Sequence, residues 1–230
     1  MKNVTSLVIS LMLVWGTGTA ATAAVIFSNG PLATNGFISD TSFANGNGGT
    51  GQFSADDFIL APGANTITDI HWNGLYAFSN TPLATDNFTI QIYANVAGAP
   101  AITPLLTIPI GNAATRTDTL VNTSFGADIF AYSVDVAPIV LAPNTVFWLS
   151  IFNNTAADTN DDWFWSMQDA AGNSQTRLDQ VSAWTLAGGV GNRQNFELTG
   201  TVAVVPEPGT LVLLAIGVGG LLGWRRRQPR

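Results

Sequence analysis

The residues best suited to chemistry in this 230-residue chain are acidic and aromatic, and many lie between residues 153 and 184. Asp158, Asn160 and Asp162 occupy the first, third and fifth positions of a calcium-loop pattern. The sixth position requires glycine for a sharp turn and is Trp163 here, which excludes an EF-hand. A looser calcium site of loop carboxylates and carbonyls stays open, beside the alternative of a solvated acidic loop.

The tryptophans of the same region allow two interpretations. Trp163, Trp165 and Trp184 could stack on the apolar C–H faces of sugar rings, while nearby Asp, Asn and Arg side chains bind the sugar hydroxyls. The alternation of Trp163 and Trp165 is equally typical of a strand that faces a core. The sequence therefore leaves carbohydrate binding, with calcium optional, beside plain core packing.

Residues that could carry catalysis are scarce. The chain has no cysteine, which excludes disulfides, thiolate metal sites and a cysteine nucleophile. The chain has one histidine, His71, and no G-x-S-x-G motif, so the sequence does not indicate a Ser-His-Asp triad. Asp56 and Asp57 are adjacent and would point to opposite faces of a strand. The match of Gly46–Gly51 to G-x-G-x-x-G lacks a following helix and indicates a loop. We therefore expect no catalytic activity and no resident cofactor other than optional calcium.

The charge balance limits the classes of molecule that the protein can bind. All acidic residues except Glu207 lie in 24–204, which has 14 of the 15 and only three arginines, a net charge near −11 without any lysine. Binding to nucleic acid requires a basic face, so nucleic acid is excluded as a partner. Anionic lipid surfaces are disfavoured for the same reason, whereas calcium and neutral sugars stay compatible.

The N-terminal segment predicts export. Residues 1–23 contain Lys2, an apolar run from Leu7 to Trp15, and small residues up to a cleavage site after Ala23. This is the order of a secretory signal peptide, and the apolar run is too short for a membrane-spanning anchor.

The C-terminal segment has three parts. Residues 205–210 form a tether in which Pro206 and Pro208 favour extended, accessible backbone around Glu207. Residues 211–224 are uncharged and would reach about 21 Å as a helix, a short transmembrane span. In the tail, 225–230, the cluster of Arg225, Arg226 and Arg227 would hold its flank in the cytoplasm.

The order of Pro206-Glu207-Pro208, apolar span and arginine cluster resembles the PEP-CTERM sorting signal, over about the last 25 residues. The resemblance implies recognition by an exosortase, a membrane-embedded transpeptidase-like enzyme, with cleavage near Pro206 to Pro208. It also implies export across the inner membrane of a Gram-negative-type cell, transient anchoring, and delivery to the cell surface or extracellular matrix. An ordinary single-pass anchor is the alternative.

Residues 24–204 predict an antiparallel β-sandwich of jelly-roll or immunoglobulin-like kind. Alternating or continuous apolar runs indicate strands, turn signals separate them, and no segment sustains a helical period. Eight to ten strands are expected, the clearest being 87–93, 130–136, 145–152 and 195–202. The strand motifs also resemble β-sandwich ectodomains common among PEP-CTERM-tagged proteins, most of which have no assigned activity. The expected function is an exported surface or matrix protein, and the alternative is a module that binds exopolysaccharide.

Overall fold

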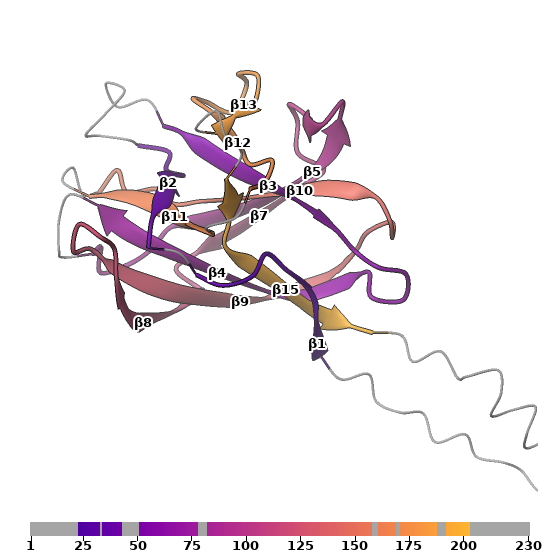
Figure 1. Ribbon diagram of the computed structural model, residues 1–230, viewed down its shortest axis with the longest axis horizontal. Coiled ribbons are helices and arrows are strands. Elements are labelled where there is room, and N and C mark those ends of the chain that lie inside the picture. The colour runs from indigo at the N-terminus through magenta and orange to yellow at the C-terminus, as the bar shows by residue number, and fades with distance from the viewer. Residues whose placement is uncertain are drawn as a thin grey trace, which may run out of the picture.

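The computed structural model describes residues 23–32, 34–42, 51–77, 82–157, 161–168, 171–187 and 192–202. In these residues the chain forms fifteen β-strands in two sheets and no α-helix (Figure 1). All the strand pairings are antiparallel. The predicted antiparallel β-sandwich is therefore confirmed.

The eight-stranded sheet is built around the long strand β4 (Thr66–Ala77). One edge of β4 pairs with β9, which in turn pairs with β8. The other edge pairs with β15 over its first half and with β11 over its last residues. The remaining strands extend these two, β1 beside β15, and β2 and β14 beside β11. The bounds are β1 Ala23–Ser28, β2 Gly36–Ile38, β8 Thr115–Asn122, β9 Asp128–Val140, β11 Asp162–Gln168, β14 Arg193–Gln194 and β15 Phe196–Thr201.

The seven-stranded sheet has β10 at its centre, between β3 and β5. Beyond β3 lie β12 and β13, and β5 pairs with both β6 and β7. The bounds are β3 Phe53–Ile59, β5 Phe88–Val96, β6 Ala99–Pro100, β7 Leu106–Gly111, β10 Val146–Phe152, β12 Gln175–Arg177 and β13 Thr185–Leu186.

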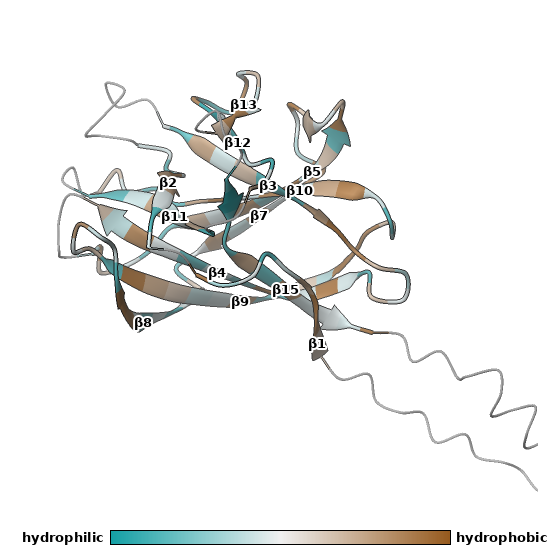
Figure 2. Cartoon of the chain, in the orientation of Figure 1, coloured by the Kyte–Doolittle hydropathy of each residue, from teal (hydrophilic) through white to brown (hydrophobic). Residues whose placement is uncertain are grey.

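The main core lies between the two sheets, where alternate residues of facing strands meet, and strands of both sheets carry apolar bands (Figure 2). Phe88 makes edge-on contacts with the rings of Trp72 and Trp163, at centroid distances of 5.3 and 5.1 Å. Beside them Gly74 must lack a side chain, because a Cβ there would lie 2.3 Å from the indole of Trp163.

The outer face of the seven-stranded sheet differs from the prediction. The alternation in 87–93 predicts a half-buried strand, yet Gln91 and Tyr93 on the outer side are 4% and 0% exposed. A second aromatic cluster covers this face, because the β5–β6 hairpin and residues 175–187 fold over it. The members of this outer aromatic cluster are Phe53, Ala55, Tyr93, Trp148, Phe152 and Trp184.

Both ends of the described chain leave the sandwich at one edge, where Ala23 pairs with Thr201 in the β1–β15 ladder (Figure 1). Residues 1–22 of the predicted signal peptide, the tether, the span at 211–224 and the arginine tail lie outside the described residues. Within the described ranges no helix has the length and apolar character needed to cross a bilayer.

Candidate functional site

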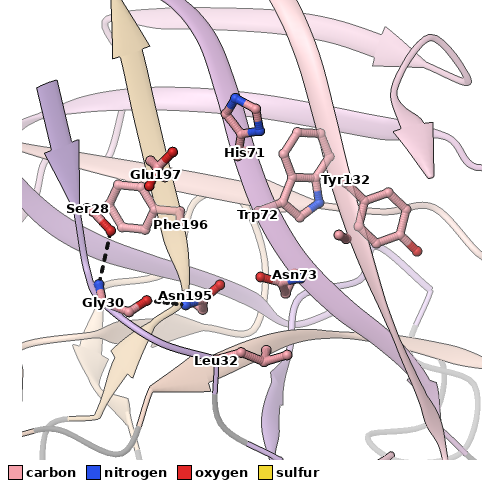
Figure 3. A pocket seen from close by; sticks show the side chains of 11 residues that line it. Ser28, Gly30, Leu32, His71, Trp72, Asn73, Tyr132, Asn195, Phe196 and Glu197 are labelled. Atoms are coloured by element: carbon pink, nitrogen blue, oxygen red, sulfur yellow. Dashed lines mark hydrogen bonds between the residues drawn. The ribbon is translucent and has the colours of Figure 1, made fainter. Parts of the chain in front are cut away.

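A sheet-face hollow of about 240 Å³ lies on the outer side of the eight-stranded sheet (Figure 3). His71 and Asn73 of β4 point into it, because Ile70 and Trp72 take the alternate positions toward the core. The segment after β1 forms its wall and is held there at Gly30. The Gly30 N–H donates to Ser28 Oγ (3.2 Å), and its carbonyl accepts from Asn195 Nδ2 (2.8 Å).

His71 lines this hollow and has an acidic partner. Its Nε2 lies 2.5 Å from Asp69 Oδ2, and its side chain is 41% exposed. Glu197 of β15 is its cross-strand neighbour. In the described part of the chain no hydroxyl group forms a hydrogen bond with His71, so the hollow has no assembled pair of nucleophile and base.

A loop-end cavity of about 550 Å³ lies where three connections meet, β4–β5, β7–β8 and β10–β11. Its volume is within the range of small-molecule sites. The lining combines neutral polar groups, amides and a hydroxyl, with apolar groups in a similar share. The residues are Leu83, Thr85, Asp86, Asn87, Gly111, Asn112, Asn154, Ala156 and Ala157.

A buried polar network supports the cavity from below. Asp86 Oδ1 accepts hydrogen bonds from the Tyr76 hydroxyl and from Asn153 Nδ2, the latter at 3.3 Å. Arg116 Nη1 donates to Asp86 Oδ2 at 3.2 Å and to the Leu83 carbonyl at 2.9 Å. Burial raises the pKa of Tyr76, and the nearby Asp86 carboxylate raises it further, so the phenol stays protonated and donates.

The same network joins the three loops to one another. Asn153 Oδ1 accepts from the backbone N–H groups of Asn87 (2.8 Å) and Asn154 (2.9 Å). Asn112 Oδ1 accepts from the Asp86 N–H at 2.9 Å. Side chains therefore fix the spacing of the loops, which is the arrangement of a preorganised binding site.

Two further buried carboxyl groups, those of Asp40 and Asp56, join segments that are remote in the chain through hydrogen bonds. Asp40 accepts hydrogen bonds from Thr155 Oγ1 (2.8 Å) and the Trp163 N–H (2.9 Å), and burial raises its pKa. Asp56 accepts from Asn29 Nδ2 (3.0 Å) and the Gln194 N–H (2.6 Å), and burial raises its pKa to about 8. Sequence reasoning did not find Asp40 or Asp86, because their partners are remote in the chain and no local motif marks them.

The three tryptophans predicted for sugar stacking do not come together. Trp163 and Trp165 are each 0% exposed within the main core, and Trp184 is 9% exposed in the outer aromatic cluster. Buried rings present no face to a sugar, so the geometry agrees with the core-packing interpretation. Groups of the protein itself contact these rings. The Trp165 indole N–H, for example, donates a hydrogen bond to the Asn195 carbonyl at 3.0 Å.

The predicted calcium loop is described only in part. Asp158 and Asn160 lie outside the described residues, and Asp162 is the buried first residue of β11. Among the residues that the structure does describe, no group of three or more His, Asp or Glu could hold a metal ion.

The sorting segment is found by comparison with known families. Residues 204–227 match the family described as the PEP-CTERM protein-sorting motif. The chain carries a PEP-CTERM sorting motif. The matched range includes Pro206-Glu207-Pro208 and the arginines 225–227, and the motif implies exosortase-dependent sorting and export across the cell envelope to the surface.

Other comparisons say little about the sandwich. No curated protein matches this chain. One solved structure is similar, the cysteine protease and lectin-like domains of Cwp84, a surface layer associated protein of Clostridium difficile. Its identity is 8% and its TM-score 0.45, and the match covers 66% of this chain but only 32% of that one.

Proposed function

We propose that this protein is an exported β-sandwich of the cell surface or extracellular matrix, delivered by its PEP-CTERM motif and without catalytic activity of its own. The observation that supports this proposal is the position of the motif, directly after the sandwich. The last described strand ends at Thr201, and the matched range begins at residue 204, so the sorting segment follows the sandwich directly. An enzyme can therefore act at Pro206 to Pro208 without opening a described strand.

The mechanism is delivery. Pro206 and Pro208 give the sorting enzyme extended backbone around Glu207, since proline lacks the N–H that a helix needs. Residues 211–224 hold the precursor in the inner membrane until cleavage, and Arg225, Arg226 and Arg227 keep that flank in the cytoplasm. We propose that the protein is anchored only transiently in the inner membrane of a Gram-negative-type cell and then reaches the cell surface.

Intact-mass measurement of the native protein from cells tests both processing steps at once. We expect a chain that lacks residues 1–23 and ends between Pro206 and Pro208, clearly lighter than the 24.1 kDa precursor. A double variant, Pro206→Ala with Pro208→Ala, should accumulate uncleaved in the membrane, whereas Pro143→Ala in the β9–β10 turn should be processed normally. Survival of residues 211–230 in the surface fraction would favour a plain membrane anchor.

The alternative of exopolysaccharide binding through Trp163, Trp165 and Trp184 gains no support from the geometry, because all three rings are buried. The calcium that would assist it has no complete ligand set among the described residues. If the sandwich binds a saccharide, another part of its surface must do so.

A further inference from the structure

The loop-end cavity lies at the end of the sandwich opposite to the chain termini. Thr66, the first residue of β4, pairs with Thr201, and Tyr76 near the other end of β4 donates to Asp86 of the cavity. Thr66 and Tyr76 lie ten residues apart on β4, which separates these two places by about 33 Å at the usual strand rise. A chain held by its C-terminal segment would therefore present the cavity away from the membrane.

The floor of the cavity has no net charge to offer. Asp86 is buried, and Arg116 neutralises it through the ion pair at 3.2 Å. Burial lowers the pKa of Arg116, but Asp86, Tyr132 and Tyr76 together raise it more, so the guanidinium stays charged in this pair. With both charges satisfied by each other, the floor suits an uncharged ligand.

The rim carries amides with unused hydrogen-bonding capacity. The side-chain carbonyls of Asn112 and Asn154 accept hydrogen bonds from the backbone N–H groups of Asp86 and Ala156, respectively. In the part of the chain that the structure describes, neither side-chain NH₂ group donates a hydrogen bond, so both are available as donors. In the described ranges the side-chain amide of Asn87 makes no hydrogen bond, so it offers a donor and an acceptor. Mixed donors and acceptors without charge match hydroxyl groups.

Two other ligand classes fit this cavity less well. An anion such as phosphate needs a free cation, and the arginine beside the cavity is engaged by Asp86. A metal ion needs several carboxylates or histidines, and the described lining contains one carboxylate, which already accepts hydrogen bonds at both oxygens.

We propose that the loop-end cavity is a binding site for a neutral saccharide, held by the amides of Asn87, Asn112 and Asn154 above the Asp86–Arg116 pair. The outward orientation of the site rests on the proposed sorting function, whereas the binding itself does not. This site is separate from the three tryptophans, which take no part in it.

Calorimetric titration of the purified full-length chain tests the proposal. The protein is kept in lauryldimethylamine oxide micelles, because sugar-based detergents would compete for the cavity. The probes are maltotriose, cellotriose and N,N′,N″-triacetylchitotriose, with trigalacturonate and inorganic phosphate as charged comparators. At least one neutral trisaccharide should bind, and both charged probes should bind more weakly than it does.

Variants then locate the binding. Ala157→Trp places an indole in the cavity and should weaken binding by about tenfold or more, a large effect on the scale of ligand affinities. Asn87→Ala removes one amide and should weaken it by a few fold. Ala142→Trp is the matched control, since it places the same side chain in the β9–β10 turn at the opposite end of the sandwich, next to the Leu141–Asn65 hydrogen bond. Near-ultraviolet circular dichroism checks that each variant is folded.

Failure of all three neutral trisaccharides to bind overturns the proposal. So does binding that Ala157→Trp leaves unchanged, or equal binding of trigalacturonate. A failure of C-terminal processing in cells would contradict the sorting function but would leave these titrations unaffected, so the two results can be told apart.

Discussion

Asp56 shows how one buried side chain makes the stability of this fold depend on pH. It lies on β3 and accepts hydrogen bonds from Asn29, which follows β1, and from Gln194 of β14, an edge strand of the opposite sheet. Burial raises its pKa to about 8, while the Gln194 hydrogen bond opposes that rise. Because the carboxyl group titrates near pH 4 when unfolded, the folded state holds a proton that the unfolded state has lost between those pH values.

The free energy of unfolding should therefore fall as pH rises from about 4 to about 8, by an amount on the order of a few kcal/mol, and level off above that. Asp40, whose pKa is also raised by burial, adds to the same trend. Asp56→Asn should flatten the curve, and urea unfolding at a series of pH values measures it. Asp135→Asn, which removes an exposed carboxylate on β9, is the control. A wild-type curve that is flat between pH 5 and pH 8 would contradict this account.

The segment 175–187 shows how a single cation joins two elements over the outer face of a sheet. Arg177 is buried, lies 4.3 Å from the centroid of the Trp184 ring, and donates to the Tyr93 hydroxyl at 2.7 Å. It also donates to the Ile102 carbonyl at 3.0 Å, which ties β12 to the loop after the β5–β6 hairpin. No carboxylate in the described ranges lies within ion-pair distance of it, and burial lowers its pKa.

Arg177→Ala should destabilise the fold by about 2–4 kcal/mol, because it leaves a cavity between aromatic rings and removes both hydrogen bonds. Arg193→Ala is the matched control, since Arg193 is partly exposed, its contact with Asp57 is long, at 3.8 Å, and it donates one hydrogen bond, to Asn29. That change should cost about 1 kcal/mol or less. Guanidinium unfolding followed by tryptophan fluorescence compares the two. Equal losses of unfolding free energy in the two variants would show that Arg177 does not hold residues 175–187 over the outer face of the sheet.

At the scale of the whole molecule, charge and topology separate the sandwich from its anchoring segment. Residues 24–204 carry a net charge near −11, and Arg116, Arg177 and Arg193 are each bonded inside the structure. An anionic lipid surface therefore repels the body. We therefore expect attachment to lipid to come from the apolar terminal segments outside the described strands.

A chain of residues 24–202 should keep the unfolding free energy of the full chain and should not bind vesicles that contain phosphatidylglycerol. The full chain should float with the same vesicles in a density gradient, because residues 211–224 supply the apolar span. Flotation of the shortened chain, or loss of its cooperative unfolding, would mean that the sandwich and the tail are not independent.

Local sequence was a good guide to strands with strong apolar patterns and a poor one to polar strands. The runs 87–93, 130–136, 145–152 and 195–202 correspond to β5, β9, β10 and β15. β8 was missed, since Thr115–Asn122 is a polar edge strand that is exposed on most of its length and gives no apolar alternation. The short strands β2, β6, β12 and β14 were missed too, because pairing with a longer neighbour defines them.

The sequence by itself determined the PEP-CTERM sorting motif, the antiparallel β class and the exclusion of cysteine chemistry, because each depends on contiguous residues or total composition. Only the tertiary structure decided that Trp163 and Trp165 are core residues and that Tyr76, Asp86, Arg116 and Asn153 form one polar network. Those residues lie up to 77 positions apart, as in the Tyr76–Asn153 hydrogen bond. A strand's own pattern shows which side chains share a face, but burial depends on what remote chain folds over that face.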